Sequence, residues 1–190
     1  MGASSGAPRA RWGWHRLTDH WAERLVDRSG VGPGDLVIDI GAGEGAITRH
    51  LVAAGARVLA VELHPGRASG LRRQYATASV RVLEVDASDL WLPGRPFRVV
   101  ANPPFAITTA VLRRLLSPRS RLQRADLVVP RYAAARWSSG RAPDSARWSA
   151  HFTVETIGYL PRRAFVPAPP EPAVVLRLQR RPTRGPTRGC

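Results

Sequence analysis

The stretch Asn102-Pro103-Pro104-Phe105 directly follows the apolar run Val99-Val100-Ala101. Proline donates no backbone hydrogen bond and pushes the residue before it toward an extended conformation. We therefore expect Asn102 and Phe105 to lie on a stiff loop at the end of a strand. The Asn102 side-chain oxygen and the Pro103 carbonyl oxygen can accept both N–H bonds of a planar amino group. The Phe105 ring offers a face on which a base can stack. Such an arrangement orients a poorly nucleophilic nitrogen for attack.

A glycine-rich turn follows the predicted strand that contains Asp39. Gly41, Gly43 and Gly45 permit a tight turn between strand and helix and a close approach of a ligand to the backbone. The spacing also fits the loose dinucleotide fingerprint through Gly41, Gly43 and Ala46. Taken alone, the turn indicates an adenosine-bearing cofactor and leaves open whether that cofactor is NAD.

Two further carboxylates end the next two predicted strands. Glu62 lies about twenty residues after the turn, where a carboxylate can accept hydrogen bonds from ribose hydroxyls. Asp86 can accept one from an adenine amino group. Open parallel sheets bind ligands at the carboxyl ends of their strands. The three acids Asp39, Glu62 and Asp86 together therefore favour a nucleoside-bearing ligand over three unrelated strand ends.

These candidate residues require an alternation of strands and helices to bring them together. Strands are predicted over residues 35–40, 57–63, 80–86, 97–101, 125–129, 150–160 and 172–179. Helices are predicted over residues 19–29, 46–55, 66–76, 107–117 and 131–139, with Thr18 capping the first and Gly30 ending it. The pattern predicts an α/β fold with a doubly wound, seven-stranded, mostly parallel sheet. The last two strands are expected to form an antiparallel pair at one sheet edge, and residues 139–149 a loop.

Charge is distributed unevenly along the 190-residue chain, which carries a net charge of +15 and no lysine. Residues 1–90 hold eleven arginines and ten acids, whereas residues 91–190 hold eighteen arginines and four acids. A basic half favours a polyanionic partner, because arginines that neutralise phosphates release condensed counterions. The alternative is solubility in an arginine-rich proteome.

The length predicts one domain over residues 12–180. We expect a disordered segment over residues 1–11 and a flexible basic tail over residues 181–190. The lone cysteine, Cys190, builds neither a disulfide framework nor a metal site. No apolar run approaches the length of a membrane span or a signal peptide. We therefore expect a cytoplasmic protein without a metal or a membrane partner, acting as a monomer.

Two motifs resemble those of methyltransferases that use S-adenosylmethionine. Asp-x-Gly-x-Gly-x-Gly from Asp39 resembles their first motif, and Asn102-Pro-Pro-Phe resembles the motif of enzymes that modify exocyclic or amide nitrogens. From Trp12 to Arg180 the order of motifs resembles the Erm and KsgA group of ribosomal RNA adenine N6-methyltransferases. The segments that carry it are "VIDIGAGEGAIT", "VELHP", "EVDASDL", "VVANPPF" and "YLPRRAFVPAPPEPAVVLRL". The likeness is greatest to short Erm enzymes without the C-terminal helical domain.

The resemblance implies a Rossmann-like class I methyltransferase fold and assigns roles to individual residues. S-adenosylmethionine would be bound by His15, Leu17, Asp39, Gly41, Gly43, Glu62, Leu63, Asp86, Ala87 and Asn102. The catalytic residues would be Asn102, Pro103 and Phe105. RNA would be bound by Arg131, Arg136, Arg162 and Arg163. His15 stands where the group usually has the asparagine of Gln-Asn-Phe.

The substrate implied by the resemblance is one adenine of 23S ribosomal RNA, whose methylation gives resistance to macrolide-type antibiotics. The first alternative is a DNA adenine methyltransferase, although the sequence offers no separate target-recognition region. The second is a protein glutamine methyltransferase, for which the basic excess has no obvious use. A third alternative is a non-catalytic RNA-binding protein that retains the fold.

Overall fold

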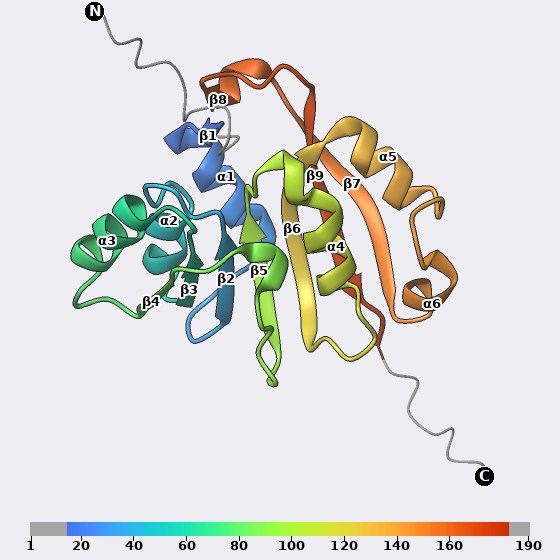
Figure 1. Cartoon of the computed structure of the whole chain (residues 1–190), viewed down its shortest axis with the longest axis horizontal. Helices are drawn as coiled ribbons and strands as arrows, with labels where there is room; N and C mark the ends of the chain where they lie inside the picture. The colour runs from blue at the N-terminus through green and yellow to red at the C-terminus, as the bar shows by residue number, and fades with distance from the viewer. Residues whose placement is uncertain (1–14, 183–190) are drawn as a thin grey trace, which may run out of the picture.

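The computed structural model describes residues 15–182 of the chain (Figure 1). Residues 1–11, predicted to be disordered, lie outside the described part, as does the basic tail from residue 183 on. A twisted seven-stranded sheet runs through the described part, and helices cover both of its faces (Figure 1).

The main sheet has seven strands in the order β4-β3-β2-β5-β6-β9-β7. The strands are β2 Leu36–Ile40, β3 Arg57–Val61, β4 Val80–Leu83, β5 Phe97–Ala101, β6 Leu122–Pro130, β7 Phe152–Leu160 and β9 Ala173–Arg180. Only β9 runs against its neighbours, because it pairs antiparallel with both β6 and β7. The predicted seven-stranded, mostly parallel sheet is confirmed, with β7 at its edge.

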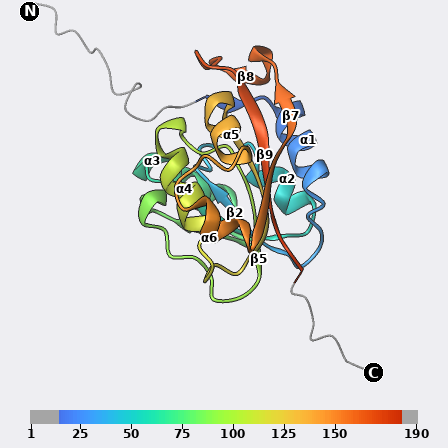
Figure 2. The same cartoon turned by 90° about the vertical axis from the view of Figure 1, so that its right-hand side faces the viewer.

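Three helices lie on each face of the sheet. The first face is covered by α1 Asp19–Ser29, α2 Thr48–Ala53 and α3 Pro65–Gln74. The other is covered by α4 Thr108–Leu115, α5 Arg131–Ser138 and α6 Ser145–Ser149. The view along the sheet shows α1 and α2 on one side and α4 and α6 on the other (Figure 2). This is the doubly wound arrangement expected from the alternating pattern.

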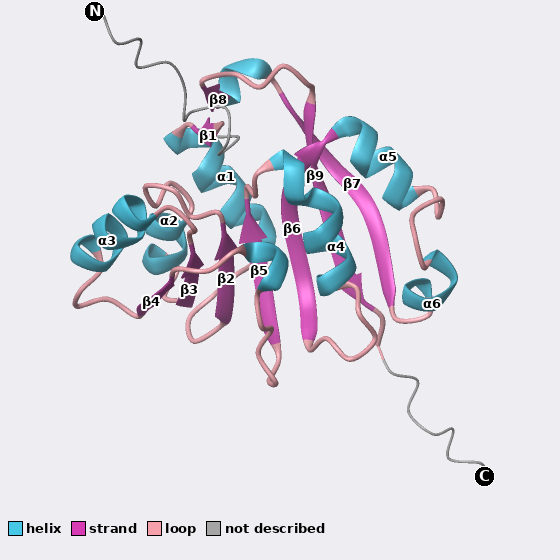
Figure 3. Cartoon of the chain, viewed as in Figure 1, coloured by secondary structure: helices cyan, strands magenta, loops and turns pink. Residues whose placement is uncertain are grey.

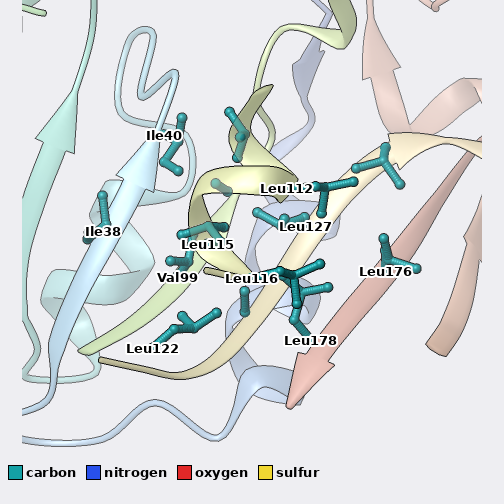
Figure 4. Packing of buried hydrophobic residues seen from close by; sticks show 14 of the residues in the cluster. Ile38, Ile40, Val99, Leu112, Leu115, Leu116, Leu122, Leu127, Leu176 and Leu178 are labelled. Atoms are coloured by element: carbon teal, nitrogen blue, oxygen red, sulfur yellow. The ribbon is translucent and has the colours of Figure 1, made fainter. Parts of the chain in front are cut away.

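The strands are apolar on both faces, because each face packs against helices. Successive strand residues point to opposite sides, so Val37 packs with α1 and α2 while Ile38 packs with α4. Figure 4 shows the α4 side, where Leu112 and Leu115 meet side chains of β2, β5, β6 and β9. This packing explains why the strand sequences read as nearly continuous apolar runs.

One prediction about the local structure is wrong, and another is confirmed only in part. The expected loop over residues 139–149 contains α6, whose Trp148 packs against Trp137 with 5.8 Å between ring centroids. Thr18 occupies the N-cap position of α1, but its side chain makes no capping hydrogen bond. Its backbone carbonyl accepts the hydrogen bond from Ala22 instead.

A second, two-stranded sheet was not predicted from the sequence. It pairs β1 Arg16–Leu17 antiparallel with β8 Phe165–Val166. It lies beyond the carboxyl ends of the parallel strands, apart from the main sheet (Figure 3). It therefore holds the chain ahead of α1 against the segment that follows β7.

Arginines of the main sheet bind the C-terminal end of α1. Arg98 of β5 and Arg124 of β6 each donate from Nη1 to the carbonyl oxygen of Ser29, at 3.2 and 3.0 Å. Arg177 of β9 donates from Nη2 to the carbonyl oxygen of Arg28 at 2.8 Å. The last carbonyls of a helix lack partners within the helix and carry partial negative charge. Three cations therefore fix α1 to the sheet at this end.

Arg177 also forms a two-pronged ion pair with Asp126 of β6. Its Nε donates to Oδ1 at 2.7 Å and its Nη2 to Oδ2 at 2.8 Å. The Asp126 carboxylate is fully buried, and its hydrogen bonds raise the pKa of Arg177. A buried carboxylate that loses its partner is strongly unfavourable.

We expect Arg177→Leu to lower the free energy of unfolding by about 3–5 kcal/mol, because Asp126 would remain buried without a counter-charge. Urea denaturation measures this difference. The matched control is Arg72→Ala, which breaks the exposed pair with Glu84 and should cost about 0–1 kcal/mol. Equal losses in the two variants would contradict the assigned role of the buried pair.

Candidate active site

A cavity of about 370 Å³ opens at the carboxyl ends of the parallel strands. This volume lies in the range of small-molecule sites. The cavity is lined by every residue predicted for cofactor binding: His15, Leu17, Asp39, Gly41, Gly43, Glu62, Leu63, Asp86, Ala87 and Asn102. Pro103 and Phe105, predicted to be catalytic, line it too. The structure thus gathers the two predicted sets in one place, while their roles stay predictions.

Asp39 supplies a buried carboxylate with one uncommitted oxygen. Its Oδ2 accepts a hydrogen bond from Thr48 Oγ1 at 2.7 Å, and its Oδ1 has no hydrogen-bond partner among the described residues. Burial raises the pKa of Asp39 to about 7, against the opposing effect of the Thr48 hydrogen bond. The nearby Glu62 raises this pKa further. A buried acceptor without a partner is unfavourable, so Asp39 fits a ligand that brings a donor or a positive charge.

Glu62 holds the glycine turn against the end of β3. Its Oε2 accepts from the backbone N–H of Gly43 at 2.9 Å, and its Oε1 accepts from that of His64 at 2.8 Å. Arg67 Nη1 lies 3.7 Å from Oε1. Each carboxylate oxygen has two lone pairs, so Glu62 can still accept from a ligand hydroxyl. It is therefore both a support of the turn and a candidate ligand acceptor.

The glycine turn lies directly against the proline loop that follows β5. Gly41 has a φ of +75°, which disfavours any residue with a side chain. A Cβ atom on Gly41 would also lie 3.0 Å from Pro104 Cδ. Glycine at this position is therefore required both by the backbone and by the close approach of the two loops.

The far end of the cavity combines one carboxylate with apolar side chains. Asp86 caps η2 (Ala87–Asp89) through Oδ1, which accepts from the backbone N–H of Ser88 at 2.8 Å. Oδ1 also accepts from Ser88 Oγ at 2.5 Å, and the side-chain and backbone hydrogen bonds from Ser88 lower the pKa of Asp86. Leu63 and Val85 line the cavity although 42% and 40% of their surfaces are exposed. Two open apolar side chains beside an acceptor suit a flat heteroaromatic ring with an amino group.

The Asn102 amide is held in one orientation by the chain ahead of α1. Its Nδ2 donates to the backbone carbonyl oxygen of His15 at 2.7 Å, across 87 residues of sequence. Because the nitrogen is committed to His15, the Oδ1 atom is the free acceptor. The hydrogen bonds among residues 15–182 do not engage the Pro103 carbonyl oxygen either. Both acceptors proposed from the sequence therefore remain open to a substrate amino group.

The His15 side chain links the proline loop to the segment after β8. Its Nδ1 lies 3.1 Å from the carbonyl oxygen of Pro167. Its ring lies 6.0 Å from that of Phe105, between centroids, at a tilt of 40°. Phe105 begins η3 (Phe105–Ile107) and is half-buried. The imidazole thus anchors the residue whose carbonyl holds Asn102, a role that the sequence did not reveal.

Several residues that line the cavity were not among those predicted. Val85 precedes Asp86 and extends the apolar wall beside Leu63. Glu44 adds an exposed carboxylate within the glycine turn. The sequence did contain a signal for Val85, which is an apolar residue next to the acidic residue at the end of a predicted strand. Glu44 carried no such signal, because a turn residue between glycines is usually solvated.

The arginines predicted to bind RNA are all exposed, and they lie in two groups. Arg131 and Arg136 belong to α5, which follows β6. Arg162 and Arg163 belong to η4 (Arg162–Ala164), which follows β7. None of the four forms an ion pair with another residue of the described part. They remain candidates for a polyanion.

No group of three or more His, Cys, Asp or Glu side chains within residues 15–182 is arranged to hold a metal ion. No helix within this range combines the length and apolar character needed to cross a bilayer.

We expect Asp39→Asn to change how stability depends on pH in the unliganded protein. The folded wild-type carboxyl, with its raised pKa, binds a proton more tightly than the unfolded one, so wild-type stability falls as pH rises from about 4 to about 7. Asparagine does not titrate, so the variant should gain relative stability over that window, by at most about 1.4 kcal/mol per pH unit. Urea denaturation from pH 4 to pH 8 tests this.

The matched variant is Thr48→Val, which removes the hydrogen bond that lowers the pKa of Asp39. In Thr48→Val the pKa of Asp39 should be higher, so the stability should keep falling up to a higher pH than it does in the wild type. A constant difference between Asp39→Asn and wild type across the range would contradict the raised pKa.

Comparisons with known proteins agree with this geometry. The "rRNA adenine N-6-methyltransferase" of Bacillus licheniformis is 32% identical over 163 residues, which are 84% of this chain and 57% of the relative. The "Ribosomal RNA small subunit methyltransferase A" of Thermosynechococcus vestitus is 35% identical over 183 residues, which are 90% of this chain and 69% of the relative. The chain thus spans little more than half the length of the Bacillus protein.

Solved structures of related proteins have a similar fold. The crystal structure of the 23S rRNA methyltransferase ErmE matches with a TM-score of 0.76 and 27% identity, over 88% of this chain and 70% of that one. A dimethyladenosine transferase from Plasmodium falciparum matches with the same TM-score at 22% identity, over 88% of this chain and 64% of that one, and so bears on the fold alone. The ribosomal RNA adenine dimethylase family matches residues 9–188. The chain therefore belongs to the ribosomal RNA adenine dimethylase family.

Proposed function

We propose that the protein transfers a methyl group from S-adenosylmethionine to the N6 amino group of an adenine in 23S ribosomal RNA. The observation that carries this proposal is the fixed Asn102 amide, whose oxygen is uncommitted and which lines the cavity together with Pro103. The same cavity contains an unpartnered buried carboxylate oxygen, which fits a ligand with a cationic centre.

The donor would be held by residues at the ends of β2, β3 and β4. Asp39 suits the methionine part, because a nearby cation would stabilise its carboxylate and lower its pKa. Glu62 suits the ribose hydroxyls, and Asp86 suits the adenine amino group, with Leu63 and Val85 against the ring. When bound, S-adenosylmethionine supplies an electrophilic methyl group on a sulfonium.

The acceptor would be held by the proline loop. Asn102 Oδ1 and the Pro103 carbonyl oxygen accept the two N–H bonds of the adenine amino group and fix the direction of its nitrogen. An amino nitrogen conjugated with the ring is a weak nucleophile, so this preorganisation lowers the barrier more than it strengthens binding. Phe105 provides a face for the base after it has left its stack. The nitrogen would gain the methyl group and lose one proton to water, while the methyl–sulfur bond of the donor breaks and leaves a neutral thioether.

Ribosomal RNA from either subunit is compatible with the relatives found. We favour 23S RNA because the sequence resembles Erm enzymes and because the ErmE structure is similar over most of the chain. Methylation there would give resistance to macrolide, lincosamide and streptogramin B antibiotics. The second candidate is 16S RNA, which the similarity to small-subunit methyltransferases supports.

We expect Asn102→Ala to lower the rate of methyl transfer by about 100-fold or more, because one of the two preorganised acceptors is lost. Binding of S-adenosylmethionine, measured by calorimetry, should survive. The control is Gln123→Ala, an exposed amide on β6 away from the cavity. Transfer that persists in Asn102→Ala would contradict the role of the amide. Loss of transfer in Gln123→Ala would point to general damage.

Cells that express the chain should contain 23S RNA on which primer extension stops at one adenine, and they should tolerate macrolides. Cells that express Asn102→Ala serve as the control. Purified large-subunit RNA should accept labelled methyl groups, whereas small-subunit RNA, duplex DNA and release factor should not. Label confined to 16S RNA would favour the second candidate, and label confined to DNA would overturn both.

A further inference from the structure

An exposed aromatic and cationic surface lies at the carboxyl ends of β6 and β7. Tyr159 is the next-to-last residue of β7, and 70% of its surface is exposed. Arg131, the first residue of α5, places its guanidinium 5.8 Å from the centre of the Tyr159 ring. Tyr132 follows and is 64% exposed. We call Arg131, Tyr132 and Tyr159 the stacking surface.

The backbone fixes the position of this surface relative to the sheet. The Arg131 N–H donates to the carbonyl oxygen of Pro172 at 2.8 Å, just ahead of β9. Pro130 at the end of β6 and Leu160 at the end of β7 both pair with Ala173 of β9. The surface is therefore carried by three strand ends rather than by a free loop. Figure 1 shows the start of α5 and the end of β7 at the same side of the sheet as β1 and β8.

The charge around the surface is positive. Residues 130–141 contain three arginines and no acid, and residues 157–172 contain two arginines and the single acid Glu171. Arg131 forms no ion pair within the described part of the chain. Exposed aromatic rings beside arginines that form no ion pair are suited to unpaired nucleotides.

The distance from the cavity sets which nucleotide can reach the surface. In the sheet order, β5 is separated from β7 by β6 and β9. Three strand spacings amount to about 15 Å. A stacked single strand advances about 3.4 Å per nucleotide, so this distance corresponds to roughly four nucleotides.

We propose that the stacking surface binds an unpaired base of the RNA roughly four nucleotides from the adenine in the cavity. The base stacks on the open face of the Arg131–Tyr159 pair, and the guanidinium also neutralises a phosphate. This inference rests on the proposed function for the identity of the RNA. The contact itself requires no methyl transfer, so the two can fail separately.

The test measures binding of a fluorescein-labelled RNA hairpin with an unpaired, adenine-containing loop, and of the fully paired duplex of the same length. Tyr159→Ala should weaken hairpin binding about 5-fold or more and leave duplex binding nearly unchanged, because a base–aromatic stack is lost. Tyr159→Phe keeps the aromatic ring and should therefore bind the hairpin with an affinity close to that of the wild type. Trp91→Ala is the matched control, since Trp91 is 91% exposed beside the last turn of α4.

The salt dependence of RNA binding distinguishes the contribution of the Arg131 guanidinium from that of the Tyr159 ring. Arg131→Ala should reduce the slope of log affinity against log salt by about 0.7, whereas Tyr159→Ala should leave the slope unchanged. Unaltered hairpin binding by Tyr159→Ala, or equal weakening of hairpin and duplex, overturns the inference. If the wild type binds the hairpin through Tyr159 but methylates no ribosomal RNA, the inference stands and the proposed function fails.

Discussion

The close approach of two loops is the constraint on which the site depends. The glycine turn after β2 and the proline loop after β5 come from neighbouring parallel strands, so they leave the same edge of the sheet side by side. Gly41 and Pro104 meet at a distance that leaves no room for a side chain at position 41. A ligand against the turn and a group against the proline loop are thereby brought into contact. The rest of the fold supplies the two strands and keeps them in register.

The fold was predictable where a sequence pattern spans several residues. The bounds of β5 match the prediction, because a mostly buried run ends at Ala101, just ahead of Asn102 and two prolines. The pairing of β1 with β8 could not be predicted, since two-residue strands have no periodicity and their partners lie about 150 residues apart. Helix α6 was missed because Ser145–Ser149 follows Pro143 and contains a single buried residue, Trp148.

The composition of the site was predictable, and its hydrogen bonding was not. Acids at the ends of parallel strands converge at one edge of the sheet, which follows from topology alone. The partner of Asn102 is a backbone carbonyl, and a backbone carbonyl leaves no trace in residue type. The carboxylate oxygens of Glu62 accept hydrogen bonds from the backbone N–H groups of Gly43 and His64. These hydrogen bonds depend on the geometry of the turn, and they compete with ligand binding. Part of the basic excess likewise has a structural use, as at the end of α1.

Helix α1 is held at both of its ends. Arginines of β5, β6 and β9 bind its last carbonyls, and the N–H of Thr18 at its start donates to the carbonyl oxygen of Ala164 at 2.9 Å. The short stretch ahead of Thr18 contains His15, whose backbone carbonyl oxygen accepts the hydrogen bond from the Asn102 amide. A protease that clipped the backbone between His15 and Arg16 would detach this carbonyl while Leu17 kept its place in the core. Such a nicked protein would remain folded, but its acceptor amide would be free to rotate.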